Sequence, residues 1–292
     1  MDWDKHYKCI DGVDTVSFDN VIDMYNAAEA EPQEGSYAAE GGYCSTQNRE
    51  LDSFQGVKNW AEAVQLRKDG WPEGLRKAEA LASKITGIVA GQMPVQEIMY
   101  AVSGNYVDIG RYLEGDPECF GYLEDTENLI NAPMGKIVRI GVNVAVSAAV
   151  DKFTIERRGA AILAVTKLLE LVGRSVTVDT IWASSDSGGG KTTNVVKTHV
   201  KKSGENLSPE SLAFAIAHPA YLRMFQFRFQ ELMPTAMAEQ HGVGYKGYPS
   251  EYSSKEYDIF LPHNLSSDFQ GDDSIVAWVK KTLAEQGIEM EV

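Results

Sequence analysis

The segment 138–150, VRIGVNVAVSAAV, has side chains whose types and spacing suit a bound cation. Its apolar pattern predicts a buried strand. Because strand side chains alternate in direction, Asn143, Ala145 and Ser147 share one face at its carboxyl end. Calcium and magnesium take oxygen ligands, usually with a carboxylate among them. This strand end offers an amide and a hydroxyl but no carboxylate. It therefore predicts a degenerate site that holds no metal, where small residues let the loops pack.

Residues 184–193, SSDSGGGKTT, contain a second motif that suits ligand binding. The triplet GKT at 190–192 is similar to the end of a GxxxxGK[ST] phosphate loop, but Ser185 stands where the first glycine belongs. Such a loop must also open a helix, so that backbone amides face the phosphate. Here TNVVKTHVKK follows and alternates like a strand. The pattern predicts a hairpin tip rather than a nucleotide site.

Two adjacent arginines, Arg157 and Arg158, begin a long apolar helix. A helix N-terminus prefers acidic side chains by about 0.3–1 kcal/mol each, so this pair indicates a specific counter-charge. Either the arginines pair with acidic residues of the N-terminal half, such as Asp108, Asp116 or Glu118, or they meet an anionic ligand or acidic partner.

Lysines around the predicted hairpin and tyrosines in the segment 241–258 complete a predicted contact surface. The lysines form one basic corner in an acidic chain, and a loop rich in Gly, Tyr and Ser is typical of a recognition surface. The predicted partner-binding residues are Arg157, Arg158, Lys191, Lys197, Lys201, Lys202, Tyr245, Tyr248 and Tyr252.

Catalytic patterns are missing from the sequence. The five histidines are scattered, and no HExxH, HxH or GxSxG occurs. A Ser/His/Asp or Cys/His site depends on proximity in space, which sequence does not give. We therefore expect a protein that is not an enzyme and that needs no cofactor.

Composition limits the class of protein. The chain has 292 residues, is 43% hydrophobic and carries a formal net charge of −15, so it can bury a core but has little general affinity for phosphate backbones. Its three cysteines lack a CxxC spacing, which fits a reducing compartment. No apolar run approaches the ~18 residues of a membrane span, and the charged stretch MDWDKHYK lacks the apolar region of a signal peptide, so we expect no secretory signal. We expect a cytoplasmic protein.

Two regions differ in composition. Residues 1–130 are acidic, polar and turn-rich, with helices predicted at 59–69 and 72–86. Residues 131–292 alternate between elements in the order strand, helix, strand, hairpin, helices, strand, helix. That order predicts an α/β layered domain with a mainly parallel sheet and one antiparallel edge strand. The N-terminal helix-rich region would pack on this domain through its two helices.

The element order from Lys136 onward is similar to that of the von Willebrand factor A fold, whose first strand ends in a cation-binding D-x-S-x-S. Asn143, Ala145 and Ser147 stand at those three positions. The strand YDIFLPHN matches one that carries a further Asp in metal-binding members, but it offers His263 and Asn264. The resemblance implies a binding module that has lost its cation site.

Three phrases, FQGVKNWAEAVQLRKDGWPEG, VDIGRYLEGDPECF and IERRGAAILAVTKLLE, resemble an uncharacterised family of tailed-phage and prophage proteins. The resemblance covers roughly residues 54–180, and GWPEG and RRGAA are its most specific parts. It implies a phage-encoded protein that acts in the infected cell or is packaged in the virion.

Together these observations predict a phage-encoded, non-enzymatic binding protein that contacts a host or phage complex. Its role would be to inhibit a host defence or to act as an accessory protein in transcription or replication. One alternative is a single-stranded nucleic-acid-binding protein that uses the lysine corner and stacks bases on tyrosines. Another is a cation-dependent adhesion module. Self-association into a homo-oligomer stays open.

Overall fold

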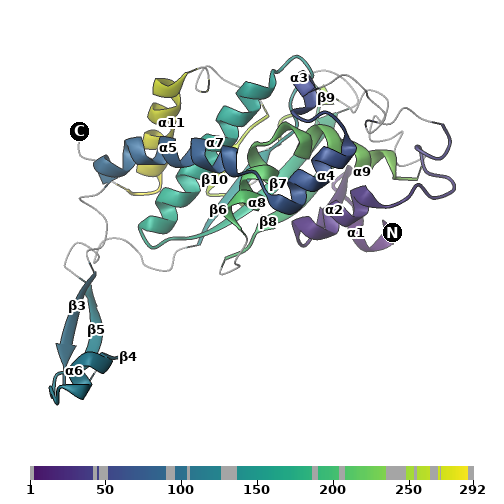
Figure 1. Cartoon of the computed structure of the whole chain (residues 1–292). Coiled ribbons are helices and arrows are strands. Elements are labelled where there is room, and N and C mark those ends of the chain that lie inside the picture. Colours follow the sequence, from purple (N-terminus) through teal and green to yellow (C-terminus); the bar gives the residue numbers. More distant parts are fainter. Residues whose placement is uncertain are drawn as a thin grey trace.

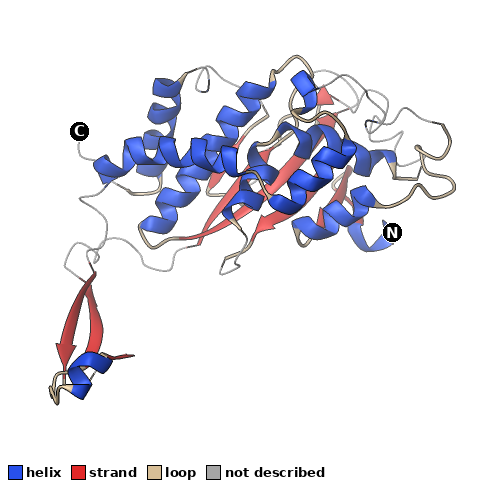
Figure 2. Ribbon diagram, in the orientation of Figure 1, coloured by secondary structure: helices blue, strands red, loops and turns tan. Residues whose placement is uncertain are grey.

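The computed structural model of the chain describes residues 3–41, 45, 52–89, 96–103, 106–125, 137–185, 190–203, 208–234, 248–252, 255–263, 269 and 271–288. Two β-sheets organise these residues (Figures 1 and 2). The larger sheet has seven strands in the order β1-β2-β8-β7-β6-β10, with β9 paired to β7. The smaller sheet has the order β3-β5-β4.

The strands of the larger sheet are β1 (Tyr7–Ile10), β2 (Val13–Phe18), β6 (Ile137–Asn143), β7 (Ser175–Ser185), β8 (Asn194–Lys201), β9 (Tyr248–Pro249) and β10 (Ile259–Leu261). Those of the smaller sheet are β3 (Gln96–Ala101), β4 (Tyr106–Val107) and β5 (Phe120–Asp125). The helices are α1 (Trp3–His6), α2 (Val21–Glu29), α3 (Asp52–Gln55), α4 (Trp60–Asp69), α5 (Pro72–Val89), α6 (Ile109–Leu113), α7 (Lys152–Leu171), α8 (Pro209–Ala217), the π-helical η4 (Tyr221–Gln226), α9 (Phe227–Glu231) and α11 (Asp272–Glu285).

The central sheet is mostly parallel, and the chain is α/β. Strand β6 pairs in parallel with β7 and β10, and β2 pairs in parallel with β8. Strand β8 turns back antiparallel to β7, which confirms the predicted hairpin. The predicted element order is also confirmed, from β6 through α7, β7, β8, α8 and β10 to α11. One detail is wrong. The antiparallel strand β8 is not an edge, because β2 pairs with its outer side.

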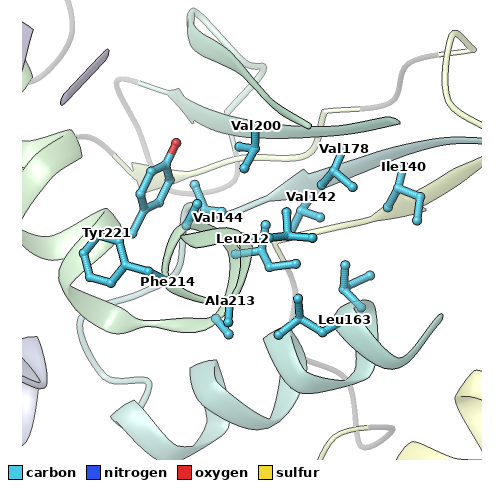
Figure 3. Close-up of a cluster of buried hydrophobic side chains, with 14 of the residues drawn as sticks. Ile140, Val142, Val144, Leu163, Val178, Val200, Leu212, Ala213, Phe214 and Tyr221 are labelled. Atoms are coloured by element: carbon cyan, nitrogen blue, oxygen red, sulfur yellow. The ribbon is translucent and has the colours of Figure 1, made fainter. Parts of the chain in front are cut away.

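One face of the larger sheet carries the helices and the main core. Figure 3 shows strand side chains such as Ile140 and Val178 gathered with Leu163 of α7 and Leu212 of α8. The middle of helix α7 is buried without interruption from Arg158 to Thr166, and Gly159–Val165 within it are all apolar, a pattern typical of a helix segment that lies within a core. The helix begins where the side chain of Asp151 accepts a hydrogen bond from the backbone N–H of Thr154, at 2.9 Å.

Helices α7 and α8 approach each other closely at Gly159. A Cβ atom at this position would lie 2.1 Å from the Cβ and 2.2 Å from the Cα of Ala217 in α8. Ordinary carbon contacts lie near 3.5–4 Å. Only glycine therefore permits this crossing, which gives the RRGAA phrase a physical reason.

A segment after β9 crosses the opposite face of β6 and β7, and the structure describes its residues 250–252 and 255–258. Its two ends are held by hydrogen bonds from the Ser250 N–H to the Ala183 carbonyl and from the Asp258 N–H to the Arg139 carbonyl, at 3.1 and 2.9 Å. A second small core lies beneath and beside the segment, formed by Ile181, Ala183 and Val195 with Tyr252, Tyr257 and Phe260 packed against it. We call residues 250–252 and 255–258 the crossing segment.

The N-terminal half packs on the rest of the chain as predicted, with α4 against α8 and α5 against both α7 and α8. It also supplies β1 and β2 to the larger sheet, so that sheet draws on both sides of the predicted boundary at residue 130. Asp11 and Gly12 join the two strands with positive φ angles of 51° and 77°, a turn that suits tight hairpins. Within the described ranges, no helix combines the length and apolar character needed to span a bilayer.

Candidate partner-binding groove

A groove of about 990 Å³ lies over the face of the larger sheet that the crossing segment only partly covers. Thr15 and Ser17 of β2 and Lys197 of β8 form its floor, and the crossing segment forms one wall. Asp11 in the β1–β2 turn and Lys191, three residues before β8, also line the groove. Its volume falls at the upper end of the range for ligand sites in proteins.

Three of the predicted contact residues line this one groove: Lys191, Lys197 and Tyr252. Tyr248 begins the nearby strand β9 and is 50% exposed, next to the lining residue Pro249. Tyr245 lies outside the described residues. The structure therefore brings together the hairpin lysines and part of the tyrosine segment, which lie more than fifty residues apart in the sequence.

The charge of Lys197 is already balanced within the chain. Its Nζ lies 2.9 Å from a carboxylate oxygen of Glu256 and 3.5 Å from one of Asp179, and it sits over the ring of Tyr257. Burial lowers the pKa of Lys197, but the Glu256 and Asp179 carboxylates outweigh this, and the pKa is raised. Among the described residues, Asp11, Lys191 and Glu251 form no ion pair, so the groove has an excess of negative charge.

Asp179, His199 and Tyr257 form a polar cluster beside the groove that the sequence did not predict. Asp179 of β7 is only 6% exposed, and its two carboxylate oxygens contact His199 Nδ1 and the hydroxyl of Tyr257, the latter at 2.8 Å. Burial raises the pKa of Asp179, but the hydrogen bond from His199 and the charges around it outweigh burial and lower the pKa. Burial and the Asp179 carboxylate raise the pKa of Tyr257.

This cluster fixes the crossing segment to the sheet. No Ser, Thr or Cys among the described residues hydrogen-bonds to His199, so the nucleophile–base contact of a hydrolase is not formed there. Asp179 and His199 stand directly opposite each other on β7 and β8. Their outward positions follow from strand alternation, but their pairing depends on the register of the hairpin, which the sequence pattern does not give.

Two polar side chains at and just after the carboxyl end of β6 bond to backbone atoms of the chain itself. The Asn143 amide donates to the Ser250 carbonyl at 3.0 Å and accepts from the Ala145 N–H at 3.1 Å. The Ser147 hydroxyl accepts from the Ala149 N–H at 3.3 Å. His263 lines the groove, and Asn264 lies outside the described residues. Nowhere in the described part of the chain do three or more His, Cys, Asp or Glu side chains gather as a metal ion would require.

Arg158 corrects an expectation, because it is only 4% exposed and is not part of an accessible surface. Its guanidinium donates to the carbonyls of Asn143, Leu261 and Pro262, so it joins the carboxyl ends of β6 and β10. Burial lowers its pKa to about 9. Neither predicted kind of counter-charge is involved. The dipoles of backbone carbonyls hold this arginine instead.

The remaining predicted residues lie away from the groove. Arg157 is exposed on α7 and lines a separate cleft. Lys201, at the other end of β8, pairs with Glu170 at 2.8 Å, and Lys202 follows it. The acidic residues considered for the arginines are engaged elsewhere: Asp108 caps α6, and Asp116 pairs with Arg111.

Comparison with known proteins places the chain in a family without assigning an activity. A family model described as a domain of unknown function, DUF7192, matches residues 8–290. No curated protein and no solved structure matches the chain. Since the match covers nearly the whole sequence, the chain belongs to the DUF7192 family.

Proposed function

We propose that this chain is a non-enzymatic binding protein that holds a protein partner in the groove beside the crossing segment. The observation that carries the proposal is the convergence of Lys191, Lys197 and Tyr252, from separate parts of the sequence, on one groove of about 990 Å³. Exposed Tyr248 extends this surface with an aromatic side chain of the kind enriched in protein interfaces.

Charge indicates the chemistry of the partner. Among the described residues, two carboxylates of the groove, Asp11 and Glu251, form no ion pair, whereas only one lysine, Lys191, forms none. The groove therefore has more unpaired negative than positive charge. The whole chain carries a formal charge of −15, which accelerates encounter with a positively charged surface. The partner we propose presents an extended segment that carries Arg or Lys, and this segment lies along the polar floor formed by β2 and β8.

The proposed biological context and domain type rest on two sequence resemblances, one to a tailed-phage and prophage family and one to the von Willebrand factor A fold. The GWPEG and RRGAA phrases support a phage-encoded protein that acts on a host or phage complex in the host cytoplasm. The order β6, α7, β7, β8, with Asn143 ending β6, supports a von Willebrand A-like domain whose strand tip serves packing instead of cation binding.

The nucleic-acid alternative receives less support from the contacts. Lys197 and Lys201 each form an ion pair with a glutamate, and Arg158 is buried. These side chains therefore add little to the net positive charge that phosphate binding needs. A gel-shift titration with single-stranded oligonucleotides separates the two functions, because salt-sensitive binding to them would favour the alternative.

The test compares complexes purified from infected cells with three tagged forms of the chain. The wild type is expected to recover a stoichiometric partner. The variant Asp11→Lys/Glu251→Lys is expected to recover at least tenfold less, because it reverses the charge of the groove. The control Glu31→Lys/Glu34→Lys makes the same charge change at exposed positions away from the groove and is expected to recover the wild-type amount.

Two results would contradict the proposal at different levels. If the wild type recovers no stoichiometric protein, the binding function itself is wrong. If both double variants recover the partner equally well, the protein binds a partner through another surface. Binding of the purified partner should also weaken as salt is raised, since the proposed attraction is partly electrostatic.

A further inference from the structure

The partner groove has acidic side chains at both ends of its floor, and the strand geometry gives the distance between these ends. Val13, Thr15 and Ser17 of β2 all line the groove, because alternate residues of a strand face the same way. Val13 and Ser17 are four residues apart, which corresponds to about 13 Å at about 3.3 Å per residue. We call the two ends of the floor the Val13 end and the Ser17 end.

Hydrogen bonds place Glu251 at the Val13 end. The Thr192 hydroxyl donates to the Glu251 carbonyl at 2.5 Å, and the next residue, Thr193, accepts a hydrogen bond from the Asp14 N–H at 2.8 Å. Glu251 therefore lies beside the first residues of β2, on the far wall of the groove.

The Val13 end has more acidic than basic groups. Asp11 is in the turn that leads into β2, and Lys191 directly precedes Thr192, so both line the groove at the same end as Glu251. In the part of the chain that the structure describes, none of these three side chains forms an ion pair. Two carboxylates and one ammonium leave an excess of one negative charge at this end.

The Ser17 end already holds a cation that the chain itself supplies. Lys197 of β8 pairs in register with Ser17. Its Nζ lies 2.9 Å from the Glu256 carboxylate, 3.5 Å from that of Asp179 and 5.2 Å from the centre of the Tyr257 ring. Carboxylates and an aromatic face stabilise a positive charge. The position of Lys197 thus shows that this end of the groove suits a cation.

Lys197 leaves Glu256 only partly neutralised. Asp179 is buried and contacts His199, whereas the Glu256 side chain is 45% exposed and lines the groove. With His199 neutral, two carboxylates share one ammonium, so this end also carries an excess of one negative charge. Lys255 precedes Glu256 but is not among the residues that line the groove. A second cation can therefore reach Glu256 from the groove.

We propose that the partner segment carries two basic side chains at positions i and i+4, one for each end of the groove. This spacing rests on the proposed function, in which an extended basic segment lies along the floor formed by β2 and β8. In an extended segment, residues i and i+4 point to the same side and are about 13 Å apart, which matches the separation of the two acidic ends.

Each basic side chain has its own acidic site. One binds Asp11 and Glu251 at the Val13 end. The other binds Glu256 at the Ser17 end, while Lys197 keeps its contact with Asp179. Arginine suits both sites better than lysine, because its planar guanidinium can form two parallel hydrogen bonds with a carboxylate.

The test measures peptide binding to the full chain by fluorescence anisotropy at low salt. The probe is a short labelled peptide of Ser, Thr and Val with two arginines four residues apart. Two control peptides have the same composition with the arginines three or five residues apart, which places them on opposite sides of an extended segment. We expect the probe to bind at least fivefold more tightly than either control. Equal binding of the three peptides would overturn the proposal.

Two variants of the chain test the two ends separately. Glu256→Gln and Asp11→Asn/Glu251→Gln remove acidic charge with little change in side-chain shape. Each is expected to weaken binding of the probe at least fivefold and to abolish its advantage over the control peptides. Glu31→Gln removes an exposed carboxylate away from the groove and is expected to leave binding unchanged. Circular dichroism checks that every variant is folded.

Two sets of results separate the spacing from the proposed function. If Glu256→Gln binds the probe as the wild type does, the Ser17 end is not a cation site and the i, i+4 spacing is wrong, even where Asp11→Asn/Glu251→Gln binds more weakly. The proposed function is decided by recovery of the partner from infected cells with the charge-reversed variant. Reduced recovery there, together with peptides that bind without preference for spacing, would reject the spacing alone.

Discussion

Replacement of Gly159 by alanine sets two physical effects against each other. Inside an exposed helix, Gly→Ala stabilises by about 1 kcal/mol, because alanine has the higher helix propensity. In this structure the added methyl group would lie 2.1 Å from the Ala217 Cβ, 2.2 Å from its Cα and 2.7 Å from the Ile216 carbonyl oxygen. Helix propensity predicts a gain in stability, whereas packing predicts a loss.

We expect the loss from overpacking to be larger than the gain from helix propensity. The contacted atoms include the backbone of α8, which a side-chain rotation cannot move aside, so α7 and α8 must separate by more than an ångström. Overpacking in a core costs about 1–3 kcal/mol and sometimes more. Separating these helices would also disturb the core that both share, which includes Leu163 and Leu212. We expect Gly159→Ala to lower the free energy of unfolding by about 2–4 kcal/mol.

Urea unfolding followed by circular dichroism measures this change, with the slope m compared between variants. Ala217→Gly in the Gly159→Ala background removes one of the clashing atoms but leaves the Ala217 Cα, so it should restore only part of the loss. The double-mutant cycle isolates this coupling. Gly159→Ala with stability equal to or above that of the wild type would refute the close crossing of α7 and α8.

Three further predictions concern the sheet face and the tip of β6. Asp179 has a lowered pKa in the folded state, so its contribution to stability is present above the unfolded value of about 3.9 and is lost as pH falls through the folded value. Asp179→Asn should therefore be less stable than the wild type at pH 7, with the difference shrinking below about pH 4; a difference constant from pH 7 to pH 3 in urea unfolding would argue against this. Tyr257→Phe removes the hydroxyl that donates to Asp179 and should lower the free energy of unfolding by about 1–3 kcal/mol, whereas unchanged thermal stability would show that the hydrogen bond contributes nothing. Mg²⁺, Mn²⁺ and Ca²⁺ should leave the melting temperature unchanged, because the Asn143 amide is bonded to Ser250 and Ala145; a saturable rise in thermal-shift assays would reveal a bound ion.

Periodicity predicted the second half of the fold because its elements are long and strongly patterned. The apolar helix 152–171 and the alternating strands around it are local features, and their order implied the α/β class. The helix N-terminus alone predicts an exposed Arg158, but the residues that follow it indicate burial. Arg158 is followed directly by the apolar run Gly159–Val165, which is buried on every side, so its guanidinium must be satisfied inside the protein.

The pairings that build the groove could not be predicted from local pattern. Strand β2 is short and carries Asp14, Thr15 and Ser17, so its alternation is weak, and its partner is β8 in the other half of the chain. The Asp179–His199 contact depends on the hairpin register in the same way. Sequence patterns singled out Lys191, Lys197 and Tyr252, but only tertiary pairing shows that these residues line one groove.

The pairing of β2 with β8 also affects how the protein is made. Asp14 pairs beside Asn194, so 180 residues must be synthesised after Asp14 before its partner strand leaves the ribosome. At about 5–20 residues per second, this wait lasts roughly 10–40 seconds. During that time the β1–β2 hairpin has no sheet to join, and an isolated two-stranded hairpin is marginally stable in water. Closure of the sheet at β2 is thus a late event in co-translational folding, and until then the nascent N-terminal strands are open to pairing with other polypeptides.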